Sequence, residues 1–170
     1  MVPQLNQSGL EKIAAEVGIL LLQRKLFLAT AESCTGGWVG QSLTAIAGSS
    51  AWYDCGFITY SNTAKAQLLG VPENVLNRHG AVSEATAQAM AQGALARSRA
   101  DWSLAITGIA GPTGGHRARP VGTVCFAWAD RQGPGTAETC HFDGDREAVR
   151  MQSAYHALQG LQERLSITPC

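Results

Sequence analysis

One feature of this sequence constrains the fold more than any other: a short strand runs into a helix through a polar, glycine-rich turn. Residues 26–29 form an apolar run typical of a buried strand, and apolar residues recur at helical spacing over residues 38–46. Between them lie Ser33, Gly36 and Gly37. Backbone N–H groups at the start of a helix favour negative charge, so this turn suits an oxyanion or a phosphate group.

The rest of the chain repeats this alternation of strands and helices. We expect strands at residues 26–30, 52–60 (with Gly56 as a candidate β-bulge), 102–106, 121–129 and 136–142. We expect helices at residues 10–21, from 35 onward, at 62–69, 84–99 and 145–165, with Ser8, Asn62 and Ser83 as candidate caps. The glycine- and proline-rich turn at 130–135 predicts an antiparallel hairpin near the C-terminus. This pattern predicts a three-layer α/β/α fold around a mixed sheet of about five strands.

Length and composition narrow the class of protein. The chain has 170 residues and shows neither an internal repeat nor a linker-like change in composition, so we expect residues 1–170 to form a single domain. The formal net charge is zero and only 15% of residues are charged, which argues against a nucleic-acid surface or a polybasic membrane patch. The sequence also lacks a signal-peptide pattern and an apolar run of membrane-spanning length.

The cysteines and histidines carry information about compartment and metals. Five cysteines without a Cys-x-x-Cys pair argue against a disulfide framework and a structural zinc site, and favour a reducing, cytoplasmic location. The four histidines lack metal-ligand spacing, so we expect neither a metal nor another cofactor. The apolar content is compatible with a homo-oligomer.

Three polar segments each follow a predicted strand: residues 33–37, 60–65 and 107–115. In layered α/β folds, ligands bind outside the carboxyl ends of the strands. We therefore expect the three segments to meet at one edge of the sheet and to form a single site.

Six motifs occur in order along almost the whole chain. They are AESCTGG (31–37), YSNTAK (60–65), GAVS (80–83), TGIAGP (107–112), PVGTV (120–124) and GDR (144–146). Together they resemble the CinA C-terminal domain family. The resemblance implies nicotinamide-nucleotide amidohydrolase activity: the hydrolysis of nicotinamide mononucleotide to nicotinic acid mononucleotide and ammonia, within pyridine-nucleotide salvage.

Amide hydrolysis needs a nucleophile, a base and an oxyanion hole, and the residues supply candidates for each. Ser33 is the expected nucleophile. Lys65 resembles the family's catalytic lysine and would act as the base, provided that burial or nearby positive charge lowers its pKa. Tyr60 matches the family's tyrosine and would relay protons or hold Lys65 in place. The oxyanion would bind backbone N–H groups of the turn: Cys34, Thr35, Gly36 and Gly37.

The glycine-rich loop at 107–115 is the expected site for the substrate's phosphate and ribose, because small residues let the backbone approach an anion closely. The residues expected to bind substrate there are Thr107, Gly108, Ala110 and Gly111. Arg146 matches the family's late arginine and would pair with the phosphate. The basic cluster at 116–119 departs from the family pattern. It either strengthens phosphate attraction or forms a solvated loop tip.

Each of these residues also has a structural interpretation. Ser33 could cap a helix, Lys65 could be a solvated helix lysine, and Cys34 could pack in the core or act as a thiol nucleophile. Glu32 either orients the site or caps a backbone group. Two other functions stay open: a hydrolase of a different amide with the same serine and lysine, and a regulatory module that binds a nucleotide without turnover.

Overall fold

The computed structural model describes residues 5–167 and contains one five-stranded sheet. The strands are β1 (Leu28–Glu32), β2 (Tyr53–Ile58), β3 (Trp102–Gly108), β4 (Thr123–Asp130) and β5 (Thr136–His141), in the order β2-β1-β3-β4-β5. β1 runs parallel to both β2 and β3, whereas β4 runs antiparallel to β3 and β5. The expected mixed sheet and its C-terminal hairpin are therefore confirmed.

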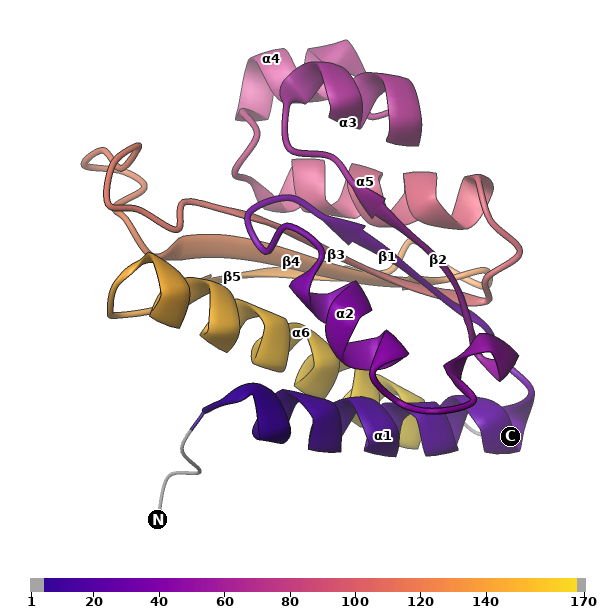
Figure 1. Cartoon of the computed structure of the whole chain (residues 1–170). Helices are drawn as coiled ribbons and strands as arrows, with labels where there is room; N and C mark the ends of the chain where they lie inside the picture. The colour runs from indigo at the N-terminus through magenta and orange to yellow at the C-terminus, as the bar shows by residue number, and fades with distance from the viewer. Residues whose placement is uncertain (1–4, 168–170) are drawn as a thin grey trace.

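Helices cover both faces of the sheet (Figure 1). They are α1 (Gln7–Arg24), α2 (Trp38–Thr44), α3 (Asn62–Leu69), α4 (Glu73–His79), α5 (Glu84–Ala96) and α6 (Arg146–Ile167), with a 3₁₀ turn, η1, at Ser49–Ala51. α2 and α6 lie on one face, and α1 packs against both from outside. α5 lies on the opposite face, with α3 and α4 packed on its outer side. The three-layer arrangement is confirmed, with α1 and the α3–α4 pair added outside it.

The two faces of the sheet bury side chains of different size. The face toward α1 and α6 carries large residues such as Leu104, Phe126 and Trp128. The face toward α5 is lined mainly by small residues, including Ala105 and Ala127, which meet further alanines of α5. Small side chains on both sides let α5 lie close to the sheet, while the opposite face buries most of the aromatic area.

The structure differs from the sequence-based expectation at two helix starts. Asn6, not Ser8, caps α1, and its side chain accepts a hydrogen bond from the Gly9 N–H. Ser61, not Asn62, caps α3 through Ala64 N–H. In both cases the capping oxygen belongs to the residue just before the first helical turn, where it can reach an unpaired N–H three residues ahead. The short helix α4 was not expected.

Two details of the strands also differ. β1 begins at Leu28 rather than Leu26, because the Leu26 N–H is still bonded to the last turn of α1. The irregularity of β2 falls at Asp54, where the register against β1 skips one residue, and not at Gly56. Gly56 instead leaves room for the hydroxyl of Tyr53 beside Thr30.

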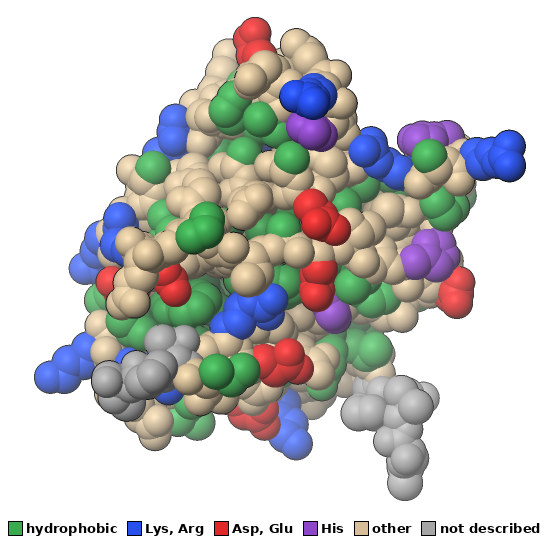
Figure 2. Space-filling model, turned by 180° about the vertical axis from the view of Figure 1, so that it is seen from behind, with side chains coloured by type: hydrophobic (Ala, Val, Ile, Leu, Met, Phe, Trp, Pro, Cys, Tyr) green, Lys and Arg blue, Asp and Glu red, His purple; other side chains and the backbone are tan. Residues whose placement is uncertain are grey.

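Within residues 5–167, no helix is both long and apolar enough to cross a membrane. On the face shown in Figure 2, basic and acidic side chains are interspersed and do not gather into a patch of one sign.

Candidate active site

Ser33 lies immediately after β1, at the carboxyl end of the parallel part of the sheet. Its N–H donates to the Ile106 carbonyl of β3, so the chain is still held to the sheet at this point. The serine is buried, with only 7% of its surface exposed. The end of the strand therefore fixes the backbone from which the serine hydroxyl projects.

Lys65 meets Ser33 from the first turns of α3. Its ammonium nitrogen, Nζ, lies 2.9 Å from Ser33 Oγ and donates to the Thr59 carbonyl at 2.8 Å. The lysine is 1% exposed, and no salt bridge joins it to a carboxylate within residues 5–167. Burial lowers the pKa of Lys65, because the charged form loses its hydration. The structure thus places Lys65 as a buried group beside Ser33 and not as a solvated lysine.

Cys34 has the opposite character. Its side chain belongs to the hydrophobic cluster beneath the site, and burial raises the pKa of its thiol to about 12. A nucleophilic cysteine reacts as the thiolate, which forms at neutral pH where the surroundings lower the pKa of the thiol. The structure therefore favours a packing role for the Cys34 side chain over a role as thiol nucleophile.

The Glu32 carboxylate organises the turn that follows Ser33. It is 1% exposed, and Oε2 accepts hydrogen bonds from Thr35 Oγ1 at 2.7 Å and from Gly37 N–H at 3.1 Å. It also accepts hydrogen bonds from the Val39 and Gly40 N–H groups of α2. A buried anion at a helix N-terminus is stabilised by these donors and by the helix dipole. Glu32 thus both caps α2 and orients the turn.

This arrangement corrects the expected oxyanion hole. The Gly37 N–H is bound by Glu32, and the Gly36 N–H donates to the Ser33 carbonyl at 3.1 Å, so neither is free for a ligand. Across residues 5–167, the Thr35 N–H has no protein acceptor, and the Cys34 N–H approaches only the sulfur of its own side chain. These two groups remain the candidates for binding an oxyanion.

Arg150 is a residue that the sequence reasoning missed. From α6, its Nε donates to the Cys34 carbonyl and its Nη2 to the Thr35 carbonyl, both at 3.0 Å. Its guanidinium also lies over the Trp38 ring. Arg150 therefore holds the Cys34–Thr35 and Thr35–Gly36 peptide groups, the first of which carries the Thr35 N–H. No motif marks it, because the contact spans more than a hundred residues.

Tyr60 does not hold Lys65 in place. The tyrosine is 63% exposed, and its hydroxyl accepts a 2.8 Å hydrogen bond from Arg146. The lysine is held instead by the carbonyl of Thr59, the preceding residue. Arg146 also donates to the Gly111 carbonyl at 2.7 Å, so it links the segment after β2 to the loop after β3.

The three polar segments converge, as expected from the topology. A cavity of about 230 Å³ is lined by Ser33, Cys34, Tyr60, Lys65, Ala81, Val82, Thr107, Gly108, Ala110 and Arg146. Gly111 does not line it and is tied to Arg146 through its carbonyl. The Thr107 hydroxyl donates to the Ala81 carbonyl at 2.8 Å, which brings the GAVS segment into the wall. The functional roles of these residues stay predictions.

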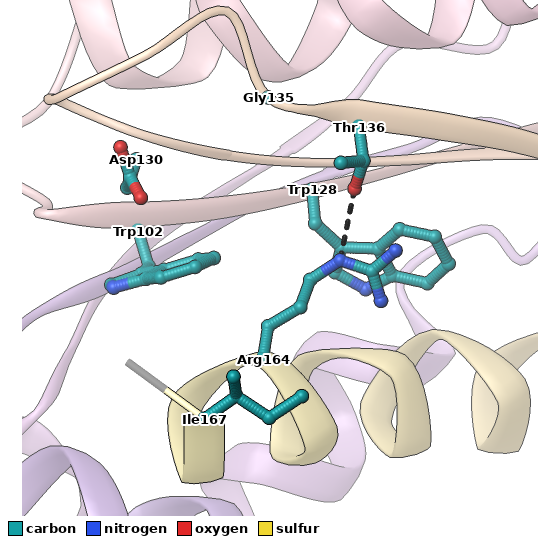
Figure 3. Close-up of a pocket in the computed structure, with 7 residues that line it drawn as sticks. All are labelled: Trp102, Trp128, Asp130, Gly135, Thr136, Arg164 and Ile167. Carbon is teal, nitrogen blue, oxygen red and sulfur yellow. Dashed lines mark hydrogen bonds between the residues drawn. The ribbon is translucent and has the colours of Figure 1, made fainter. Parts of the chain in front are cut away.

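A larger cavity, of about 340 Å³, lies at the other end of the sheet, where β3 begins and β4 ends (Figure 3). Its wall is mainly aromatic and aliphatic, and Arg164 crosses it, lying 3.9 Å from the Trp128 ring and donating to Thr136. It contains no serine or lysine. The chemistry is therefore expected in the smaller cavity.

The fold and the site define a three-layer α/β protein with a buried serine–lysine pair at the carboxyl ends of its parallel strands. The chain belongs to the CinA C-terminal domain family, whose sequence model matches residues 10–165. It is 51% identical to the nicotinamide-nucleotide amidohydrolase PncC of Escherichia coli K12, over 94% of this chain and 97% of that protein. The protein of the same name from Pseudomonas putida is 47% identical over 88% of this chain and 92% of that one.

Solved structures agree with this assignment. The crystal structure of the competence/damage inducible protein CihA from Agrobacterium tumefaciens superposes with a TM-score of 0.89 at 43% identity, covering 93% of this chain and 96% of that one. A competence damage-inducible protein A from Klebsiella pneumoniae gives a TM-score of 0.90 at 41% identity, covering 94% and 99%. The family and the fold are therefore established by both sequence and structure.

Proposed function

We propose that this protein hydrolyses the carboxamide of nicotinamide mononucleotide, with Ser33 as nucleophile and Lys65 as general base. The observation that carries the proposal is the buried 2.9 Å contact between Lys65 Nζ and Ser33 Oγ. The names of relatives at about 50% identity over most of the chain supply the substrate class. This reaction would place the protein in pyridine-nucleotide salvage.

The geometry supports a two-step acyl transfer. Neutral Lys65 accepts the Ser33 hydroxyl proton along their contact, and Ser33 Oγ attacks the carboxamide carbon. The Cys34 and Thr35 N–H groups would stabilise the tetrahedral oxyanion. When the C–N bond breaks, protonated Lys65 returns the proton to the leaving ammonia. Lys65 then takes a proton from a water molecule as its oxygen attacks the acyl ester. When the bond to Ser33 Oγ breaks, Lys65 returns this proton to the serine and the carboxylate product leaves.

Burial of the lysine is the condition for this mechanism. An exposed lysine would be protonated at neutral pH and could not accept the serine proton. The Thr59 carbonyl keeps Nζ pointed at Ser33 without supplying a negative charge that would hold the ammonium form. The local structure thus combines a fixed position with a lowered pKa, the two requirements of a lysine base.

The phosphate of the substrate would bind at the rim formed by Arg146 and the loop after β3. Arg146 uses one N–H of each terminal nitrogen to hold Gly111 and Tyr60. A guanidinium carries five N–H donors, so the remaining ones could bind phosphate oxygens. The same contacts that occupy part of Arg146 also fix its orientation, which suits it to recognise a substrate.

A nucleotide-binding regulator is the main alternative from a different class. A buried lysine without a carboxylate partner costs stability and offers nothing to a module that only binds a ligand, so the pair favours an enzyme. Ammonia release from nicotinamide mononucleotide by the purified protein tests the proposal. Release from another carboxamide, but not from this one, would keep the mechanism and replace the substrate.

A further inference from the structure

A second group of reactive side chains lies away from Ser33, where β5 passes alongside α6 (Figure 1). Glu138 and Cys140 are alternate residues of β5, so both side chains point to the face of the sheet that packs against α6. His156 of α6 reaches both of them. Its Nε2 is 2.6 Å from Glu138 Oε1 and 3.5 Å from Cys140 Sγ. The three ligand atoms lie within 4.8 Å of one another.

The spacing of the histidines along the sequence does not reveal this group. The partners of His156 lie 16 and 18 residues earlier, on a strand. Metal-ligand spacing is recognisable in a sequence only when the ligands share one turn, loop or helix face. Here, strand alternation supplies two ligand atoms and the packing of α6 supplies the third.

A catalytic cysteine triad would use the same residue types, but the geometry argues against it. In a triad, the nucleophile and the carboxylate contact opposite nitrogens of the imidazole, so that one nitrogen takes the proton while the other is oriented. Here, Cys140 and Glu138 both approach Nε2. The sulfur, nitrogen and oxygen therefore lie close together on one side of the imidazole, as the ligands of a single ion do.

We propose that Glu138, Cys140 and His156 bind one divalent transition-metal ion, with zinc as the best match. Zinc takes thiolate, imidazole and carboxylate ligands in tetrahedral sites, and three protein ligands leave the fourth position to water. Zinc–ligand bonds of about 2.3 Å to sulfur and about 2.0 Å to nitrogen, at tetrahedral angles, separate these two atoms by roughly 3.5 Å. The Sγ–Nε2 distance already has this value. The carboxylate then exchanges its hydrogen bond to His156 for a bond to the ion.

The surroundings of His156 favour a preformed site. Its ring packs against Phe126, with 4.7 Å between centroids, and against Phe142 at 5.9 Å. The side chains of His156 and Glu138 are 30% and 45% exposed, so an ion can enter from solvent. Arg164 interacts electrostatically with Glu138, but its guanidinium lies over the Trp128 ring and donates to Thr136 (Figure 3). The soft sulfur ligand selects against magnesium and calcium.

Cobalt(II) titration tests the site directly, because a cobalt ion bound to a thiolate has a charge-transfer absorption that other ligands do not produce. We expect one Co²⁺ per chain with this absorption in the wild type, and its displacement by Zn²⁺. The matched control is Cys55→Ser, which removes a half-buried thiol from β2 at the opposite edge of the sheet and should change nothing. Cys140→Ser should abolish the absorption, and Glu138→Gln should weaken binding at least tenfold.

Thermal unfolding supplies a second readout that does not depend on the spectrum. An ion that links β5 to α6 stabilises the folded state, so Zn²⁺ should raise the Tm of the wild type and of Cys55→Ser but not of Cys140→Ser. Absence of the charge-transfer absorption in the wild type would overturn the proposal. Equal absorption in Cys140→Ser would do so too, because the ion would then be bound by another cysteine. Glu138→Gln, at a half-exposed position, keeps the test decisive if Cys140→Ser does not fold.

Discussion

Arg150 of α6 donates a 3.0 Å hydrogen bond to the carbonyl of Cys34, 116 residues earlier in the chain. A second bond from the same guanidinium holds the Thr35 carbonyl. The last helix therefore fixes the peptide group that carries the Thr35 N–H, one of the two candidate oxyanion donors next to Ser33. The turn is held from its other side by the carboxylate of Glu32. The site therefore depends on side chains that need not touch the substrate.

Arg150→Ala should lower kcat about 10- to 100-fold while KM changes little. Loss of an oxyanion donor typically costs about 10²–10³ in rate, and displacing the Thr35 N–H should cost somewhat less than removing it. Steady-state ammonia release measures the effect. Arg78→Ala, at an exposed position of α4, is the control. A wild-type kcat for a folded Arg150→Ala protein would show that Arg150 does not position the site.

Glu32→Gln should destabilise the fold by about 1–3 kcal/mol, the usual cost of leaving buried donors unsatisfied. The carboxylate accepts hydrogen bonds on both oxygens, and an amide group can accept on only one of them. Urea unfolding measures the change. Glu163→Gln, an exposed residue of α6, should stay within a few tenths of a kcal/mol of the wild type. Equal stability of the two variants would contradict the account of Glu32.

Activity should depend on pH through Lys65. Burial lowers the pKa of Lys65 from the ordinary value of 10.5, and only the neutral amine can accept the serine proton. Thus kcat/KM should rise about tenfold per pH unit below the lowered pKa and level off before pH 10.5 is reached. Lys65→Arg, which stays protonated, should be inactive throughout. A profile that keeps rising up to the ordinary lysine pKa would show that Lys65 is not the base.

The same pKa shift makes stability depend on pH. The unfolded chain binds the Lys65 proton at its ordinary pKa, whereas the folded protein binds it only at lower pH. The free energy of unfolding should therefore increase with pH between the lowered pKa and 10.5. Lys65→Met, which has no titratable group at this position, should lack this part of the increase. Parallel pH dependences for the two proteins, measured by denaturant unfolding, would contradict the buried position of the amine.

Arg146→Ala should mainly raise KM for nicotinamide mononucleotide, because the proposed contact is to phosphate and not to the reacting amide. The same variant should have little effect on the nucleoside that lacks the phosphate. Tyr60→Phe, which removes only the hydroxyl that Arg146 binds, should keep kcat within about tenfold of the wild type. A much larger loss of kcat would show that Tyr60 relays protons.

The sequence predicts the architecture well because strand and helix periodicities repeat along the chain, and because the glycine-rich turns mark where strands end. It also indicates that the segments containing Ser33, Lys65 and Thr107 meet, since parallel strands bring their carboxyl ends to one edge. Side-chain partners are less predictable. Arg150 and Glu32 act through hydrogen bonds whose geometry depends on helix packing, and Gly37 becomes unavailable to a ligand only because Glu32 turns toward it.

The most direct test of the account is ammonia release from nicotinamide mononucleotide by the wild type, Ser33→Ala and Lys65→Met, each shown to be folded by circular dichroism. The account predicts release by the wild type, with nicotinic acid mononucleotide formed in equal amount, and none above background by either variant. Wild-type rates from Ser33→Ala or Lys65→Met would contradict the serine–lysine mechanism.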